Sequence, residues 1–164
     1  MCYRMNTPSS GIYGLLLIFV SLLSACGTID VFEKNVAIPA HEWSSSFKPE
    51  IEFEITDTTA FYNIYVVLRH TDAYRYNNIW MNVYTQVPGD SINKQRLDLR
   101  LATDDKGWLG SGMDDIFEHR ILITRTPQQL KKAGVYKFRL EQIMREEPLQ
   151  YVMNVGIRVE KVSS

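Results

Sequence analysis

Apolar and polar residues alternate with a period of two along most of the chain after residue 49. In Glu50–Ile55, for example, three glutamates alternate with two isoleucines and a phenylalanine. A period of two places alternate side chains on opposite faces of a strand, so such a segment predicts a half-buried β-strand. The alternation recurs in five further segments, Tyr62–Arg69, Ile79–Val87, Arg96–Leu101, Tyr136–Glu141 and Tyr151–Glu160, and we expect a further short strand at Phe117–Ile123. We therefore expect an all-β fold, an antiparallel β-sandwich of jelly-roll or Ig-like type with about seven to eight strands.

One segment predicts a short helix instead of a strand. In Thr126–Gly134, Thr126 suits the N-cap, Pro127 suits the first helical position, and Gly134 suits the residue after the last turn. We expect one or two helical turns there, and at most this one short helix in the domain.

The N-terminal segment carries the pattern of a bacterial lipoprotein signal. An apolar run, Gly11–Leu23, leads into Leu23-Ser24-Ala25-Cys26, which is typical of a lipobox. The run is shorter than the roughly 20 residues of a membrane-spanning helix, and it matches the apolar region of about 7–15 residues in a signal peptide. Small residues before Cys26 let a peptidase reach the backbone, and the thiol accepts a diacylglyceryl group. The alternative is an ordinary signal peptide whose cleavage site happens to contain a cysteine.

These features divide the chain into three expected parts. They are a lipoprotein signal peptide at 1–25, a lipidated tether and lead-in at 26–48, and a β-sandwich domain at 49–164. The lipid on Cys26 would anchor the protein to a membrane, because two or three acyl chains make attachment effectively permanent. Gly27 follows the cysteine without an acidic residue directly after it, which favours the outer membrane. Whether the domain faces the periplasm or the cell surface stays open.

Charge and cysteine content narrow the classes of partner. The formal net charge is −1, whereas a nucleic-acid partner would need a clustered basic face. We therefore expect no nucleic-acid partner. Of the two cysteines, Cys2 leaves with the signal peptide and Cys26 carries lipid, so no thiol remains for a disulfide or a cysteine-based metal site.

The sequence contains no recognisable catalytic motif. His41, His70 and His119 lie in three different segments without a metal-ligand spacing, and no nucleophile elbow occurs. We expect no enzyme activity, no catalytic residues, no metal site and no cofactor beyond the covalent lipid. Calcium is the one possible exception, in the glycine- and aspartate-rich loop Asp104–Asp115. The simpler interpretation of that loop is a structured turn in which Trp108 closes the end of the sandwich.

A row of aromatic and amide residues forms a candidate binding face. Trp80 and Tyr84 point the same way along their predicted strand, and Tyr65 joins them if the preceding strand pairs with it. Flat aromatic rings beside amides could stack on a glycan or form a protein contact. The alternative is that the lead-in Val31–Phe47 covers this face, because its own aromatic residues need burial.

With these features in place, the chain resembles the gliding motility lipoprotein GldH family. Besides Cys26, the similar stretches follow the family's order along the chain: Ile51–Thr58, Tyr62–Arg69, Tyr76–Val83, Gly107–Gly112 with Asp115-Ile116, Gly134–Arg145 and Val155–Glu160. The resemblance implies a membrane lipoprotein of the bacterial gliding apparatus, a machinery linked to protein secretion and adhesin movement. It implies no catalytic or cofactor residue.

Two functional hypotheses follow. The first is a non-catalytic structural or interaction subunit of a gliding-motility complex in the cell envelope, with motility or secretion proteins as partners. The alternative is a glycan-binding envelope lipoprotein that uses Tyr65, Trp80 and Tyr84.

Overall fold

The computed structural model describes residues 31–162, and nearly all of its regular structure is β-strand. Eight of these strands have six or more residues: β1 (Val31–Ala37), β3 (Glu50–Ile55), β4 (Phe61–Thr71), β5 (Asn78–Gln86), β6 (Ile92–Arg100), β10 (Ile116–Leu122), β12 (Gly134–Gln142) and β14 (Val152–Lys161). The shorter strands are β2 (Glu42–Trp43), β7 (Ala102–Thr103), β8 (Gly107–Trp108), β9 (Ser111–Met113), β11 (Gln128–Gln129) and β13 (Leu149–Gln150). The predicted all-β class is confirmed.

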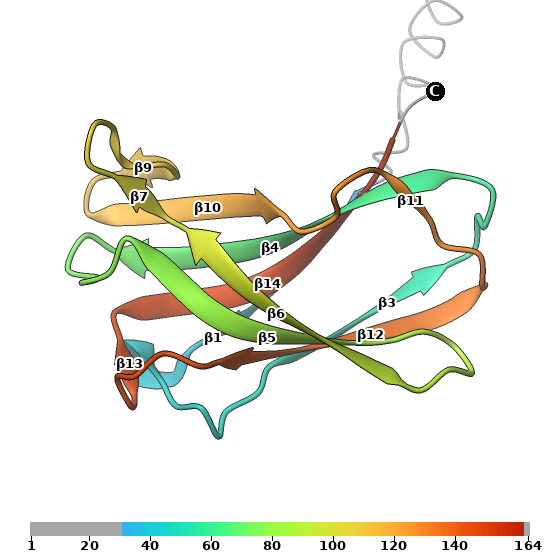
Figure 1. The fold of residues 1–164 in the computed structure, drawn as a ribbon, viewed down its shortest axis with the longest axis horizontal. Helices are drawn as coiled ribbons and strands as arrows, with labels where there is room; N and C mark the ends of the chain where they lie inside the picture. Colours follow the sequence, from blue (N-terminus) through green and yellow to red (C-terminus); the bar gives the residue numbers. More distant parts are fainter. Residues whose placement is uncertain (1–30, 163–164) are drawn as a thin grey trace, which may run out of the picture.

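The long strands form two antiparallel sheets that face each other as layers (Figure 1). One sheet has the order β1-β14-β4-β10-β9, with β11 beside β4, and the other has the order β3-β12-β5-β6. The short pairs β2–β13 and β7–β8 lie outside these two sheets. The molecule is therefore an antiparallel β-sandwich, as the alternation predicts.

The core lies between the two sheets and is built from the inward rows of the strands. Along β5, Ile79, Met81 and Val83 are at most 1% exposed. On the facing sheet, Val66 and Leu68 of β4 are fully buried. Each buried side chain of this size stabilises the fold by about 1.5–3 kcal/mol relative to an exposed one.

The described part of the lead-in, from Val31 onward, packs as part of the sandwich. β1 pairs with β14 along its whole length, from Val31 opposite Glu160 to Ala37 opposite Asn154. After a single 3₁₀ turn at Pro39–His41, Trp43 enters the core and is fully buried. Burial of the lead-in's apolar residues against the core accounts for this packing.

The predicted helix at Thr126–Gly134 is wrong. The segment instead contains β11, in which Gln128 pairs with Tyr62 and Gln129 with Phe61. β10 ends at Leu122, opposite Tyr65, and so leaves the start of β4 free on that side. An isolated helix of one or two turns is unstable in water, whereas β11 completes an existing sheet.

The expected signal peptide and Cys26 lie outside the described residues. Within residues 31–162, no helix has the length and apolar character needed to cross a bilayer.

Candidate functional site

Trp80 and Tyr84 lie together on the outer face of the four-stranded sheet. Both are half-buried, and they project away from the core because Met81 and Val83, which alternate with the outward residues of β5, point inward. This is the arrangement that the alternation in Ile79–Val87 predicts. In the described part of the lead-in, β1 lies in the other sheet and Trp43 is in the core.

Tyr65 does not join this face. It lies on β4, which pairs with β10 and β14 in the other sheet, so its side chain projects from the opposite side of the sandwich. The expected pairing of β4 with β5 is wrong because the chain crosses between the layers after Thr71. Tyr74, which is 3% exposed, fixes this crossing by donating a hydrogen bond from its hydroxyl to the carbonyl oxygen of Asn78 at 3.0 Å.

A network of ion pairs surrounds Tyr65 on its own face. Glu33 of β1 accepts from Arg158 at 3.1 Å and from Arg120 at 3.2 Å. Arg120 also contacts Glu118 at 2.7 Å, and Glu118 pairs with Arg69. The charges are therefore largely balanced within the face, which leaves little net field to attract a charged partner.

Cations lie over both aromatic rings of the four-stranded sheet. The guanidinium of Arg96 is 4.6 Å from the centroid of the Trp80 ring. Tyr84 has two such neighbours, the ammonium of Lys94 at 5.3 Å and the guanidinium of Arg139 at 5.0 Å. These distances lie within the cation–π range, where each contact contributes about 0.5–1 kcal/mol at an exposed site.

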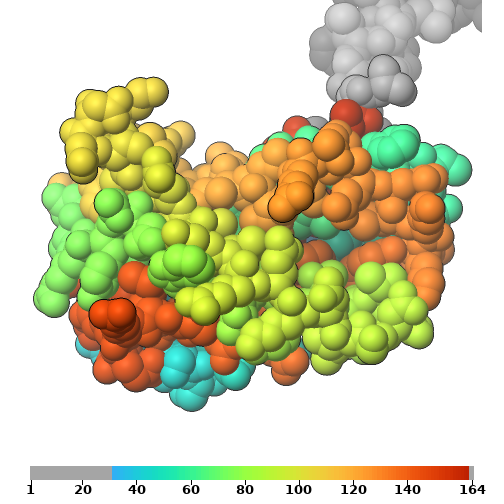
Figure 2. All heavy atoms as spheres, viewed as in Figure 1, coloured from blue at the N-terminus to red at the C-terminus, as the bar shows by residue number. Residues whose placement is uncertain are grey.

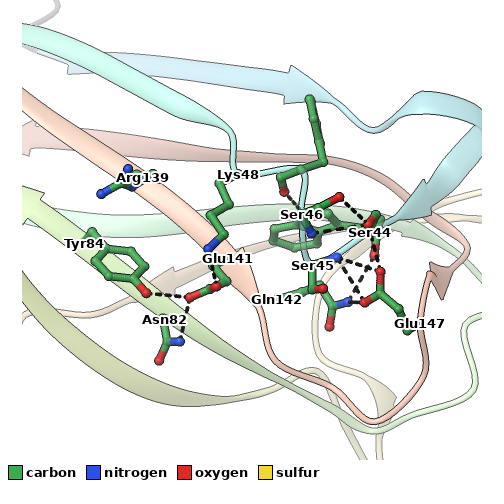
Figure 3. A network of polar contacts seen from close by, with 12 residues as sticks. Ser44, Ser45, Ser46, Lys48, Asn82, Tyr84, Arg139, Glu141, Gln142 and Glu147 are labelled. Atoms are coloured by element: carbon green, nitrogen blue, oxygen red, sulfur yellow. Dashed lines mark hydrogen bonds and ion pairs between the residues drawn. The ribbon is translucent and has the colours of Figure 1, made fainter.

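Glu141 of β12 organises the polar groups beside Tyr84 (Figure 3). It contacts the ammonium of Lys48 at 2.6 Å, the hydroxyl of Tyr84 at 2.6 Å and the amide nitrogen of Asn82 at 2.8 Å. Partial burial opposes its ionisation, but these donors outweigh burial and lower the pKa of Glu141 to about 2. The carboxylate is therefore fixed in place and is charged at neutral pH.

A second carboxylate, Glu147, holds the lead-in against the sheet (Figure 3). Its oxygens accept from the hydroxyl of Ser44 at 2.8 Å, the backbone N–H of Ser45 at 3.0 Å and the side-chain amide of Gln142 at 2.9 Å. These hydrogen bonds lower the pKa of Glu147. Ser44 and Ser45 therefore both donate to one carboxylate.

Several hollows adjoin this sheet. A shallow one of about 210 Å³ lies next to Tyr84 and is lined by Glu50, Lys137 and Arg139 among others. A larger one of about 520 Å³ opens between β6 and the segment after β10, where Figure 2 shows a recess between the yellow-green and orange atoms. Asn93 and Gln95 of β6 line it, so polar amides face a gap that the core does not fill.

The aspartate-rich loop does not gather metal ligands. No group of three or more histidine, cysteine, aspartate or glutamate side chains in residues 31–162 is arranged to hold a metal ion. The loop instead projects from one end of the sandwich, in yellow in Figure 2. Trp108 turns back from it and packs edge-on against His70, with ring centroids 4.4 Å apart.

A buried histidine pair lies beneath Trp108, and sequence reasoning missed it. His70 and His119 are 0% and 3% exposed, and their Nε2 atoms are 3.0 Å apart. His70 Nδ1 is 2.6 Å from the carbonyl oxygen of Thr71, which can only accept, so Nδ1 carries the proton. The bare Nε2 of a neutral His70 then accepts from Nε2–H of His119. The only indication in the sequence was the position of His70, which continues the series of alternate, inward-facing residues along β4.

Burial lowers the pKa of both histidines, because the charged form loses its hydration. The neighbouring His70 adds to this effect and brings the pKa of His119 to about 4. The pair is therefore neutral at physiological pH and belongs to the core. The groups that remain accessible are the cations and rings of β5, β6 and β12, which suit recognition of acidic groups.

Comparisons with known proteins agree over almost the whole chain. A family model described as GldH lipoprotein matches residues 30–159. The "Gliding motility lipoprotein GldH" of Flavobacterium johnsoniae is 27% identical over 155 residues, which cover 90% of this chain and 95% of the relative. The "Gliding motility lipoprotein GldH homolog" of Christiangramia forsetii is 24% identical over 154 residues, which cover 90% of this chain and 93% of the relative.

Proposed function

The chain belongs to the GldH lipoprotein family, and on this premise we propose that it is a membrane-anchored, non-catalytic subunit of a bacterial gliding-motility complex. The single observation that carries the proposal is this family match over residues 30–159, which runs from the start of the sandwich to the last strand. The named relatives are gliding motility lipoproteins and cover nearly the same length. The proposed anchor is the lipid on Cys26, and the proposed location is the outer membrane.

The geometry supports a role in protein contact. Cations and aromatic rings share one face of the four-stranded sheet, while the only paired histidines in the described residues are buried under Trp108. Arg and Trp side chains are frequent at the centres of protein interfaces. We propose motility or secretion proteins of the envelope as the partners.

The test is affinity purification of the tagged, detergent-extracted lipoprotein from its own cells, with mass spectrometry of the bound proteins. We expect envelope motility or secretion proteins to copurify with the wild type and with a Tyr65→Ala control. A Trp80→Ala/Tyr84→Ala variant should recover several-fold less, because it removes the rings but leaves the opposite face intact. Recovery of polysaccharide alone, or of no specific protein, would contradict the proposal.

A Cys26→Ala variant should lose its membrane attachment or accumulate as uncleaved precursor, because it removes the lipobox thiol that accepts the diacylglyceryl group. Membrane fractionation and metabolic labelling with an alkyne fatty acid measure both outcomes. Cys2→Ala is the matched control, since it removes the other cysteine and should change neither attachment nor labelling. A Cys26→Ala protein that stays acylated and membrane-bound would show that the anchor lies elsewhere.

Glycan binding at Trp80 and Tyr84 remains a prediction without a supporting observation. A sugar stacks on the open face of an aromatic ring, but here Arg96, Lys94 and Arg139 lie over these rings. A glycan would first have to displace the cations. Acidic groups, by contrast, would gain from the cations as they stand.

A further inference from the structure

The outer face of the four-stranded sheet is divided into stripes of different chemistry, one for each strand. β3 presents three glutamates, Glu50, Glu52 and Glu54, all exposed. β12 presents Lys137, Arg139 and Glu141, β5 presents Trp80 and Tyr84, and β6 presents three cations and one carboxylate: Lys94, Arg96, Asp98 and Arg100. The prevailing order across the sheet is therefore acidic, basic, aromatic, basic.

The two basic strands differ in what lies beside them. β12 has aromatic β5 on one side and acidic β3 on the other, where Lys137 contacts Glu52 at 2.6 Å and Arg139 contacts Glu50 at 3.7 Å. β6 has β5 on one side, where its cations cover the rings of Trp80 and Tyr84. On its other side, no strand within residues 31–162 pairs with it. β6 therefore lacks the acidic neighbour that β12 has.

We propose that β6 of one molecule pairs with β3 of a second copy of this chain. β3 is at the opposite edge of the same sheet, and on that side no strand within the described residues pairs with it. The pairing would repeat, between molecules, the contact that β3 makes with β12 within one. This self-association goes beyond the proposed function and does not depend on it.

Strand direction and side-chain parity both permit this pairing. Neighbouring strands alternate in direction across the four-stranded sheet, so β3 and β6 of one molecule run in opposite directions. A second copy placed beside the first in the same orientation therefore presents its β3 antiparallel to β6 of the first. The glutamates of β3 then lie on the same face as the cations of β6. The register that opposes unlike charges places Glu50 opposite Arg96 and Glu52 opposite Lys94, which leaves Glu54 opposite Ile92.

The charges also disfavour the competing arrangements. Two β3 edges would oppose glutamates to glutamates, which is a common way for edge strands to avoid self-pairing, and two β6 edges would bring together strands that each carry three cations and one carboxylate. The β3–β6 contact joins edges of opposite net charge, so the charges favour this arrangement. Such a contact is head-to-tail and leaves one free edge of each kind on a dimer.

Cysteine crosslinking tests the contact without removing either charge pair. Glu54→Cys and Ile92→Cys are introduced into separate copies of the full-length lipoprotein, which are purified in detergent, mixed and treated with a short bismaleimide. We expect a crosslinked dimer that contains both copies. A chain with both substitutions should form species larger than a dimer. The chain without introduced cysteines is the blank, and Lys106→Cys mixed with Ile92→Cys is the control for random collision.

Charge reversal is the second readout. Lys94→Glu/Arg96→Glu should reduce the crosslinked product about tenfold, because two attractive cross-strand pairs become repulsive. Lys106→Glu/Arg125→Glu changes the net charge equally at exposed positions outside both strands, and it should leave the yield unchanged. Circular dichroism confirms that each variant is folded. Crosslinking no greater than the collision control, a ladder that stops at the dimer, or equal loss in both charge variants would overturn the proposal.

Discussion

A Trp43→Ala variant should unfold with a free energy about 3–5 kcal/mol lower than the wild type. Trp43 is fully buried, and its indole nitrogen donates to the carbonyl oxygen of Phe47 at 2.9 Å. The carbonyl oxygen of Trp43 in turn accepts from the amide of Gln142 at 3.2 Å. Truncation would leave a cavity at the base of the lead-in and an unpaired buried acceptor at Phe47. The loss is a large part of the 5–15 kcal/mol that stabilises a typical domain.

Urea unfolding followed by far-ultraviolet circular dichroism measures this change. Phe47→Ala is the matched control, because Phe47 lies four residues away and is 37% exposed. The Phe47→Ala substitution should lower the free energy of unfolding by well under half as much as Trp43→Ala. Equal midpoints for the two variants would mean that Trp43 contributes no more than a surface aromatic, and that the lead-in docks by other contacts.

Acidification should destabilise the domain before its carboxylates titrate. The folded state keeps His70 and His119 neutral, whereas the unfolded chain protonates its histidines below about pH 6.5. The unfolded state therefore binds more protons as the pH falls from about 6.5 towards about 4, and stability falls with it. Between pH 6.5 and pH 5, the lowered pKa of His119 alone should reduce the free energy of unfolding by about 2 kcal/mol, since each pH unit contributes about 1.4 kcal/mol.

The measurement is the free energy of unfolding at pH 7, 6 and 5 for the wild type and for His70→Gln/His119→Gln. The variant should be less stable at pH 7, because it loses the Nε2–Nε2 hydrogen bond and the packing under Trp108. Its stability should nevertheless change much less between pH 7 and pH 5. His41→Gln replaces the exposed third histidine and should retain the wild-type slope. A double variant with an unchanged slope would show that other groups carry the effect.

The alternation of the sequence predicted the strands and their faces but not their partners. The apolar residues in Glu50–Ile55 and Ile79–Val87 face the core as expected. With a side-chain period of two, the apolar set of a strand can face only one side of the sheet or the other, and burial selects the core side. The same rule cannot show that β4 and β5, which follow each other along the chain, lie in different sheets. That choice depends on the six-residue crossing at 72–77 and on the burial of Tyr74, neither of which has a periodic signature.

The candidate site was predictable in part for the same reason. Trp80 and Tyr84 share a strand, so their common face followed from spacing, whereas Tyr65 required a pairing that does not form. The cations over the two rings come from neighbouring strands and became visible only with the register of the sheet. The histidine pair likewise joins residues 49 positions apart, and no local pattern connects them.

The pairing of the first strand with the last has a mechanical consequence. β1 joins the sheet through a ladder of antiparallel pairs with β14, and Val31 at its start lies opposite Glu160 near the chain's end. Hydrogen bonds in such a ladder lie perpendicular to the strands. A tension applied at Val31 along the strand axis therefore loads the whole ladder at once, in shear, instead of opening it one bond at a time. A domain pulled from its N-terminal end in that direction would transmit force to β14, which lies between β1 and β4 in the larger sheet, before it yields.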